Sequence, residues 1–377
     1  MTTRVTLGIT LGGMTDWSAL GDRWRELEAR AHVSFFQSWS WIGCLGPERY
    51  ANPVLLEARR DGRTVALALF NRRRRWLFDT LWLHESGHTE HDAVFIEYNG
   101  LLCETLLSET LAMETGADET VLAACLSAAR CAPLPGRRLV RRVMLNGVDP
   151  AHLRAAGAAG TIFGLSTRMA PTLDLAALRR DGRHHLDVLS ANTRAQLRRS
   201  LRAYGALGPL GMRRAADAPE AHRFLDGLAS LHQATWQRRG RPGAFAQPHF
   251  ARFHHGLIDR ALPRGEIELW RVDAGSAVIG YLYNFQFRGR VSAYQSGFDY
   301  ALADQRAKPG LTCHHLAIEH GLAEGRDCYD FLAGDDRYKR SLSDGARPLH
   351  WLSIGPRLGC MRLAASVRGL KRRSLSL

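Results

Sequence analysis

Two stretches of the sequence share one order of strand and turn signals, and this internal repeat constrains the fold more than any other feature. In residues 53–87, short apolar segments are separated by Asp61-Gly62 and by a basic run at residues 71–75. In residues 267–297, similar segments are separated at residues 273–275 and 288–290. Polar or glycine-containing turns between such segments are typical of hairpins. The sequence therefore predicts two copies of one antiparallel three-stranded meander.

Helical patterns accompany each meander. Residues 16–31 and 34–46 precede the first meander, and residues 218–240 precede the second. After the second meander, residues 308–325 place apolar side chains at helical spacing, and residues 326–334 return to a strand pattern. Helices that alternate with antiparallel strands in this way predict an α+β fold.

The length of the chain favours more than one domain. A single core seldom grows much beyond about 250–300 residues, and this chain has 377. We place the boundary in the Gly- and Ala-rich segment 153–175, which contains Pro171. The predicted domains are residues 1–165 and 166–355, followed by a basic tail at 356–377. The tail suits either a solvated terminus, which we favour, or a peripheral helix on a membrane surface.

Composition restricts the partners and the compartment. The formal charge of +14 indicates anionic partners such as nucleotides, nucleic acid or a membrane surface. The seven cysteines are scattered and lack a C-x-x-C pair, which argues against a disulfide framework and a zinc ribbon. The sequence shows neither an apolar run of membrane-spanning length nor a signal-peptide pattern. We therefore expect a cytoplasmic protein.

One short motif resembles a metal site, but its context argues against one. Residues 84–88, HESGH, match the H-E-x-x-H pattern, which requires a helix to bring both histidines to one face. Gly87 interrupts the motif and a strand pattern precedes it. His314 and His315 could serve as ligands or bases, although a core position is the preferred interpretation of His315. We predict no metal.

An arginine-rich helix is predicted at residues 189–208. Leu197, Leu201 and Tyr204 form an apolar face, and Arg194 and Arg198 belong to a row of arginines that repeats every four residues. Exposed helices usually mix both charges, and acids are absent from this segment. Arginine binds phosphate with two hydrogen bonds, so the row indicates an anion-binding surface.

The sequence RAKPGLTCHH opens the helix after the second meander. Proline suits the first turn of a helix, and here Pro309 follows Lys308 and precedes Gly310 and Leu311. The glycine allows a ligand to approach the free backbone N–H groups. We expect these four residues to contact the pyrophosphate of a cofactor.

The ordered set LSANTRAQLRRSLR, SGFD, KPG and YDFLAGDDRYK resembles the CelD/BcsL branch of the GNAT acyltransferases, which is related to the FemABX peptidyltransferases. The resemblance extends over residues 166–355 and more loosely over the first half. It implies two tandem GNAT-like domains, of which the first is degenerate, and transfer of an acyl group from acyl-CoA, with acetyl-CoA as the expected donor, to an amine. Some family members are linked to polysaccharide or cell-envelope synthesis.

The resemblance also implies roles for individual residues. Tyr338 and Lys339 match an aromatic–lysine pair whose lysine stabilises an oxyanion in the FemABX relatives. Ala333 stands where arginine is common, and the usual pyrophosphate loop of the superfamily is absent, so coenzyme A is inferred from resemblance alone. Aminoacyl-tRNA as donor stays open.

The chemistry of amine acylation requires donors for an oxyanion and a base for the amine. We expect Asp335 to serve as the base, although it and its neighbour could instead brace the loop. We expect substrate contacts at Trp236, Asp299, Asp330 and Gly334, and Asp330 also suits a role in orienting its strand. A non-catalytic basic adaptor that binds nucleic acid or an anionic polymer is the third hypothesis.

Overall fold

The chain divides into two compact units in the computed structural model. The structure describes residues 7–75, 78–104, 118–136, 140–302, 306–334 and 336–356. The first unit comprises Met1–Arg168 and Pro348–Leu377, and the second comprises Met169–Arg347. The predicted basic tail lies outside the described residues from residue 357 onward.

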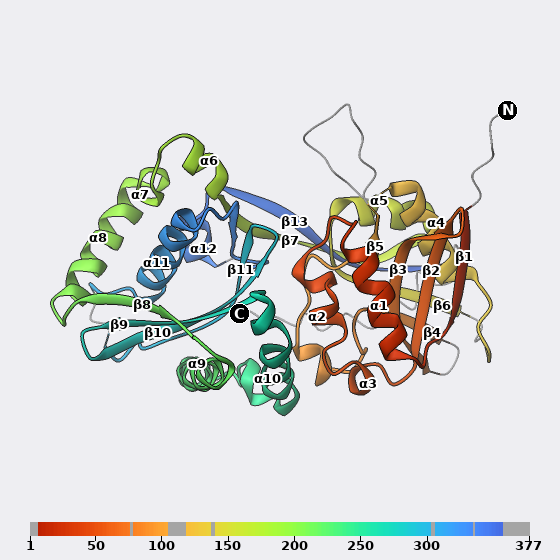
Figure 1. The fold of residues 1–377 in the computed structure, drawn as a ribbon, viewed down its shortest axis with the longest axis horizontal. Helices are drawn as coiled ribbons and strands as arrows, with labels where there is room; N and C mark the ends of the chain where they lie inside the picture. The colour runs from red at the N-terminus through yellow and green to blue at the C-terminus, as the bar shows by residue number, and fades with distance from the viewer. Residues whose placement is uncertain are drawn as a thin grey trace. The chain divides into compact units, whose positions relative to one another are not determined.

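The first unit is built on a mixed sheet with helices on both faces (Figure 1). The strands follow the order β1-β2-β3-β4-β6-β13-β7, and β5 pairs with β3. The bounds are β1 Leu7–Gly13, α1 Trp17–Glu28, α2 Trp39–Ile42, α3 Gly46–Arg49, β2 Pro53–Arg60, β3 Arg63–Arg75, β4 Phe78–Leu83, β5 Leu102–Cys103, α4 Glu119–Cys131, β6 Val140–Val148, α5 Pro150–Ala159, β7 Thr161–Asp174 and β13 Gly345–Gly355.

The first predicted meander is confirmed, with one correction. Strands β2, β3 and β4 pair antiparallel in sequence, and the β2–β3 turn uses Asp61 and Gly62, both at positive φ. The predicted basic turn at residues 71–75 is wrong, because these residues continue β3. Arg72 is buried there and bonds Asp79 at 2.7 Å and 2.8 Å, which neutralises its charge within the sheet.

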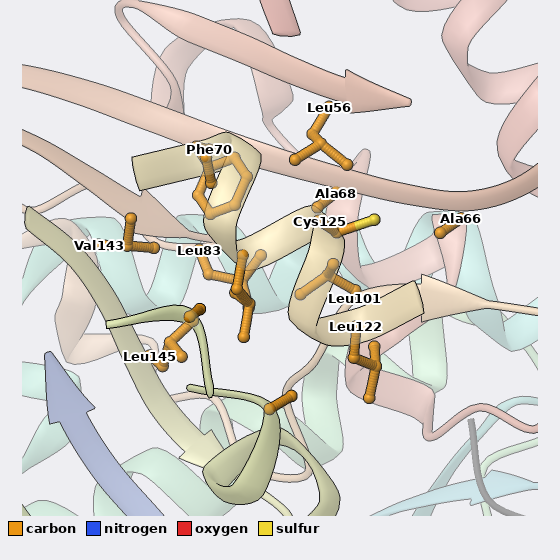
Figure 2. Packing of buried hydrophobic residues seen from close by; sticks show 14 of the residues in the cluster. Leu56, Ala66, Ala68, Phe70, Leu83, Leu101, Leu122, Cys125, Val143 and Leu145 are labelled. Carbon is orange, nitrogen blue, oxygen red and sulfur yellow. The ribbon is translucent and has the colours of Figure 1, made fainter. Parts of the chain in front are cut away.

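A hydrophobic core lies between this sheet and helices α4 and α5. Figure 2 shows part of it, where Leu122 and Cys125 of α4 face Leu56, Phe70 and other side chains of the strands. All four are fully buried. Burying a leucine or phenylalanine side chain stabilises a fold by about 1.5–3 kcal/mol, so this unit has a core of its own.

The second unit repeats the architecture with strand order β7-β12-β11-β10-β9-β8. Helices α9 and α10 cover one face of its sheet, and α8 and α11 cover the other (Figure 1). The bounds are α6 Leu175–Arg180, α7 His185–Val188, α8 Ala191–Gly205, β8 Leu210–Arg214, α9 Ala218–Arg238, α10 Pro248–Ala261, β9 Ile267–Ala274, β10 Ala277–Phe287, β11 Arg290–Phe298, α11 Pro309–Ala323, β12 Cys328–Asp330 and α12 Arg337–Ser341.

The second predicted meander is confirmed as β9, β10 and β11, which pair antiparallel in sequence. Arg288 and Gly289 turn the β10–β11 hairpin at positive φ, as Asp61 and Gly62 do in the first unit. The α+β fold class is therefore confirmed.

Two further segments bear on the sequence analysis. The small-residue segment 153–175 folds as most of α5 and all of β7, and the division between the units falls inside that strand. HESGH forms no helix, and His84 has a φ of 55° and bonds Asn99.

Within the described residues, no helix is both long and apolar enough to cross a membrane.

Candidate functional site

Strands β11 and β12 separate soon after they meet. They are parallel neighbours for three residue pairs, from Arg290–Ser292 to Cys328–Asp330. Strand β11 continues to Phe298 beside β10, and its register shifts opposite Tyr283 and Asn284, which marks a bulge. Beyond the separation, this edge of β11 has no ladder partner among the described strands. It therefore offers backbone hydrogen-bonding groups to a ligand.

Asp330 fixes the point of separation. The residue is fully buried, and its Oδ2 accepts a 2.6 Å hydrogen bond from Nη1 of Arg290. Its Oδ1 accepts a 2.7 Å bond from the backbone N–H of Leu332, which has a φ of 59°. Both carboxylate oxygens thus hold the turn that carries the chain from β12 toward α12.

Lys339 of α12 lies against this turn. Only 4% of the residue is exposed, and its Nζ donates to the carbonyl of Ala333 at 3.3 Å. A Cβ at Gly334 would lie 2.9 Å from the same Nζ, and Gly334 has a φ of 156°. The loop therefore encloses the ammonium group closely, and glycine at position 334 leaves the space for it.

His314 of α11 connects the strands to α12. Its Nδ1 lies 2.9 Å from the hydroxyl of Tyr329, and its ring stacks on Tyr338 with the centroids 5.6 Å apart. Its Nε2 is buried and has no hydrogen-bond partner among the described residues. A buried, unsatisfied nitrogen is costly, so this atom is a candidate contact for a bound substrate.

Burial sets the protonation states of these groups. It lowers the pKa of His314 to about 3, and the positive charge of Lys339 contributes in the same direction. Burial also raises the pKa of Tyr338, with a further contribution from the negative charge of Asp336. The site therefore presents a neutral imidazole and a protonated phenol near pH 7.

The end of α9 adds an aromatic and cationic group. The ring of Trp236 is mostly buried and lies 5.4 Å from the guanidinium of Arg239. The charge of Arg239 affects the pKa of both Tyr300 and Tyr338, so the three residues lie near one another. Burial is the main cause that raises the pKa of Tyr300.

Helix α8 packs beside the start of α11. Ser200 Oγ accepts a 2.7 Å hydrogen bond from the N–H of Lys308 and lies 2.8 Å from Oγ1 of Thr312. Within the described residues, no hydrogen bond occupies the next free N–H groups of the helix, those of Gly310 and Leu311. A helix start with free N–H groups favours an anion.

The side chain of Phe298 links this helix start to the residues around Lys339. A Cβ at Gly310 would lie 3.3 Å from the Phe298 ring, whose centroid is 5.9 Å from that of His314. The helix start and the histidine therefore contact the same aromatic side chain.

The structure brings together only part of the predicted site. Tyr338, Lys339 and Gly334 lie together. Trp236 contacts Arg239, whose charge affects the pKa of Tyr338. Arg194 is half-buried and donates to the carbonyl of Leu189, whereas Arg198 is exposed. Asp299 accepts hydrogen bonds from the N–H groups of Ala301 and Leu302. Asp335 lies outside the described residues, and its neighbour Asp336 precedes α12.

Sequence reasoning missed several residues of this site. Tyr329, Tyr300, Arg239 and Phe298 were not predicted, and His314 was named only as a possible ligand or base, not as a residue of this site. The order of the elements offered one signal, because His314 follows the helix start by one turn and Tyr329 lies in the last strand before the lysine. Their contacts depend on tertiary packing.

Residues 191–340 match a family model described as an acetyltransferase (GNAT) domain. The second unit therefore carries a GNAT acetyltransferase domain, and the protein is an acyltransferase. A comparison with curated proteins gives no match.

Solved structures with a similar fold extend the likeness over both units. FemX is 10% identical with a TM-score of 0.58, and the match covers 95% of this chain and 100% of FemX. The C-terminal domain of a putative lysylphosphatidylglycerol synthetase from Agrobacterium fabrum is 12% identical with a TM-score of 0.53, covering 93% and 95%. L-PGS from Bacillus licheniformis is 11% identical with a TM-score of 0.51, covering 91% and 96%. These likenesses concern the fold.

Proposed function

We propose that the second unit transfers an acyl group from acyl-CoA to an amine, at the end of the sheet where β11 and β12 separate. One observation carries the proposal: the free edge of β11, the start of α11 and the enclosed ammonium of Lys339 converge around Phe298 and His314. The edge of β11 supplies backbone groups for an extended donor. The start of α11 favours phosphate, and Lys339 supplies positive charge.

Lys339 is assigned to the carbonyl oxygen of the acyl group. When the amine attacks the thioester carbon, the C–N bond forms and negative charge develops on this oxygen. A fixed donor aimed at such an oxygen lowers the barrier by roughly 3–4 kcal/mol. Lys339 is suited to this because its ammonium donates to the Ala333 carbonyl and lies so close to Gly334 that a Cβ there would crowd it.

Tyr338 is assigned to the leaving group. As the tetrahedral intermediate collapses, the C–S bond breaks and the thiolate takes a proton. The raised pKa keeps the Tyr338 phenol protonated, so its hydroxyl can donate a hydrogen bond to the departing sulfur, while the proton that the thiolate takes is the one released by the amine. Asp335 is the proposed base that accepts a proton from the amine, on sequence grounds alone.

The donor side is assigned to α8 and α11. The N–H groups of Gly310 and Leu311 are available for a pyrophosphate, with Lys308 and Pro309 at the same helix start. Arg194 and Arg198 lie on α8, whose Ser200 bonds the first residue of that start. Acetyl-CoA is the proposed first donor to test.

A Fem-like transfer from aminoacyl-tRNA is the second candidate. The fold likeness to FemX over both units and the formal charge of +14 support it. The putative lysylphosphatidylglycerol synthetase among the similar structures also supports it, because its name denotes transfer of an aminoacyl group to a lipid. A non-catalytic adaptor that binds nucleic acid or anionic envelope polymers is the third hypothesis.

Calorimetry in one buffer separates these candidates. Acetyl-CoA, longer acyl-CoAs, charged tRNA and duplex DNA are each titrated into the full chain. We expect saturable binding of acyl-CoA. Saturable binding of charged tRNA without acyl-CoA binding would favour the Fem-like reaction, and equal binding of tRNA and DNA without turnover would favour the adaptor.

Replacement of Lys339 tests the catalytic assignment. We expect Lys339→Arg to fold and bind donor but to lose on the order of a hundredfold or more in turnover, because guanidinium is planar and broad where a compact ammonium is enclosed. Lys339→Met should behave similarly. Release of free thiol from acyl-CoA measures turnover, and Arg340→Lys, at the exposed neighbouring position, is the control. Wild-type turnover in Lys339→Arg would remove the proposed role.

A further inference from the structure

Two histidines and a glutamate meet between α7 and α11, on residues that the proposed reaction does not use. Nδ1 of His185 and Nδ1 of His315 lie 3.0 Å apart. Glu319 lies one helical turn after His315, and the ligand atoms of all three residues lie within 4.8 Å of one another. Both histidines are buried, while Glu319 is partly exposed.

We propose that His185, His315 and Glu319 form a binding site for a divalent transition metal ion of the zinc class. This departs from the sequence-based expectation of no metal, because only the fold brings His185 to His315. The chemistry of the three groups is that of a protein zinc site, in which imidazole nitrogens and a carboxylate oxygen are ordinary ligands. The spacing also fits, because residues i and i+4 of a helix present their side chains on one face.

Hydrogen bonds around the cluster already orient the ligands. Nε2 of His185 lies 3.3 Å from the carbonyl oxygen of Leu342, so this nitrogen carries the proton and the lone pair of Nδ1 faces His315. The backbone N–H of His185 donates to Oε1 of Glu319 at 3.1 Å, which fixes the carboxylate. Metal-binding histidines typically donate their second N–H to a carbonyl in this way.

The distances require only small movements. Zinc–nitrogen bonds of about 2.0–2.1 Å in a tetrahedral site place two nitrogens about 3.3 Å apart. The two Nδ1 atoms therefore need to separate by about 0.3 Å. Oε1 of Glu319 lies 4.0 Å from Nδ1 of His315, and its partly exposed side chain can approach. The exposed side chain of His184 lies beside the cluster, with its Nδ1 3.8 Å from Oε2 of Glu319.

A second histidine pair in the same unit shows what distinguishes this cluster. Nδ1 of His222 and Nδ1 of His255 lie 2.7 Å apart, but their carboxylate neighbours approach the opposite edges of the rings. Asp259 bonds Nε2 of His222, and Asp226 lies 3.4 Å from Nε2 of His255. These acids are on the far sides of the rings, so this pair lacks a converging carboxylate. It provides a matched control.

Metal binding would stabilise the short helix α7. Helix α7 spans only His185–Val188, which is too short to be stable by itself, and only two residues separate it from the start of α8. A bond through the metal would join this segment to α11. Metal binding would thereby stabilise the position from which the arginine-rich helix begins.

Metal titration of the tag-free chain, first stripped with EDTA, tests the proposal. We expect one Zn²⁺ per chain by calorimetry and, with Co²⁺, the visible bands of a tetrahedral site without the near-ultraviolet band of thiolate ligation, because the free cysteines are the competing ligands. His315→Gln should weaken Zn²⁺ binding by about 100-fold or more. His222→Gln should bind as the wild type does.

Glu319→Gln keeps the assay informative if His315→Gln does not fold. The amide oxygen can still accept from the His185 N–H, so the fold should persist while a charged ligand is lost. Saturating Zn²⁺ should raise the Tm of the wild type and of His222→Gln but shift that of Glu319→Gln much less. An unchanged Co²⁺ spectrum in both variants, or no Zn²⁺-dependent rise in the wild-type Tm, would overturn the site.

Discussion

A single lysine illustrates how local packing selects a residue. The chain fills 51 basic positions and uses lysine at only Lys308, Lys339 and Lys371. Arg337 and Arg340 on either side of Lys339 are exposed, whereas Lys339 is buried. A compact ammonium fits between the Ala333 carbonyl and Gly334, while a guanidinium fork is planar and wider. The sequence could indicate the unusual lysine, but only the structure shows that it is enclosed.

Gly334→Ala tests the enclosure directly. The added Cβ would lie 2.9 Å from Nζ of Lys339, and the backbone φ of 156° disfavours a side chain. We expect displacement of the ammonium and a loss of turnover of about tenfold or more, with a Tm decrease of a few degrees. Thiol-release kinetics and thermal denaturation measure the two effects.

Gly211→Ala serves as the control for Gly334→Ala. Position 211 lies in β8, and an added Cβ there meets nothing within 4 Å. Turnover of the Gly334→Ala protein equal to that of the Gly211→Ala protein would show that the position of the ammonium does not limit the reaction.

At the scale of elements, the short strand β12 depends on a buried ion pair. Asp330 is fully buried and bonds Arg290 at 2.6 Å across the β11–β12 pair. Asp330→Asn should lower the free energy of unfolding by about 1.5–3 kcal/mol, because a charge-assisted bond is lost and Arg290 keeps its charge. Urea denaturation measures the change.

Asp273→Asn is the matched comparison. Asp273 pairs with Arg271 at 2.8 Å on β9, but both side chains are partly exposed. Exposed pairs contribute roughly 0–1 kcal/mol, so this variant should lose less stability. Equal losses in the two variants would show that burial of Asp330 adds nothing.

The arginine-rich helix α8 makes a prediction about the donor. Arg198 is exposed beside the buried face formed by Leu197 and Tyr204. If it meets a phosphate, Arg198→Gln should weaken acyl-CoA binding about tenfold and reduce the dependence of binding on salt. Arg223→Gln, exposed on α9, is the control. Equal affinity and salt dependence in the two variants would make α8 a solvated surface.

Local patterns predicted most elements but not all of their ends. Both meanders and the helices α1, α8, α9 and α11 follow from periodicity, turns and caps, which act within a few residues. The continuation of β3 through residues 71–75 could not be predicted in this way. It depends on Asp79 of the next strand, which neutralises Arg72 and also lies near Arg141 of β6. The three-residue length of β12 likewise depends on its partners, β11 and β7.

For the whole molecule, buried neutral histidines in both units should govern acid stability. Burial lowers the pKa of His84 in the first unit to about 3 and that of His232 in the second unit to about 4, from the ordinary value of 6.5. Below pH 6.5 the unfolded chain therefore binds protons that the folded chain does not. Stability is highest above pH 6.5 and is lost as the pH falls toward 4, by up to about 1.4 kcal/mol per pH unit for each histidine.

Thermal denaturation between pH 7 and pH 4.5, with EDTA present, measures this loss. The Tm should fall continuously below pH 6.5, and His232→Gln should show a shallower fall than the wild type, because the glutamine does not titrate. A lower Tm of the variant at pH 7 does not affect the comparison, because the two proteins are compared by the slope of Tm against pH. A wild-type Tm that stays constant from pH 6.5 to 4.5 would contradict the depressed pKa values, and with them the burial of neutral imidazoles in the two cores.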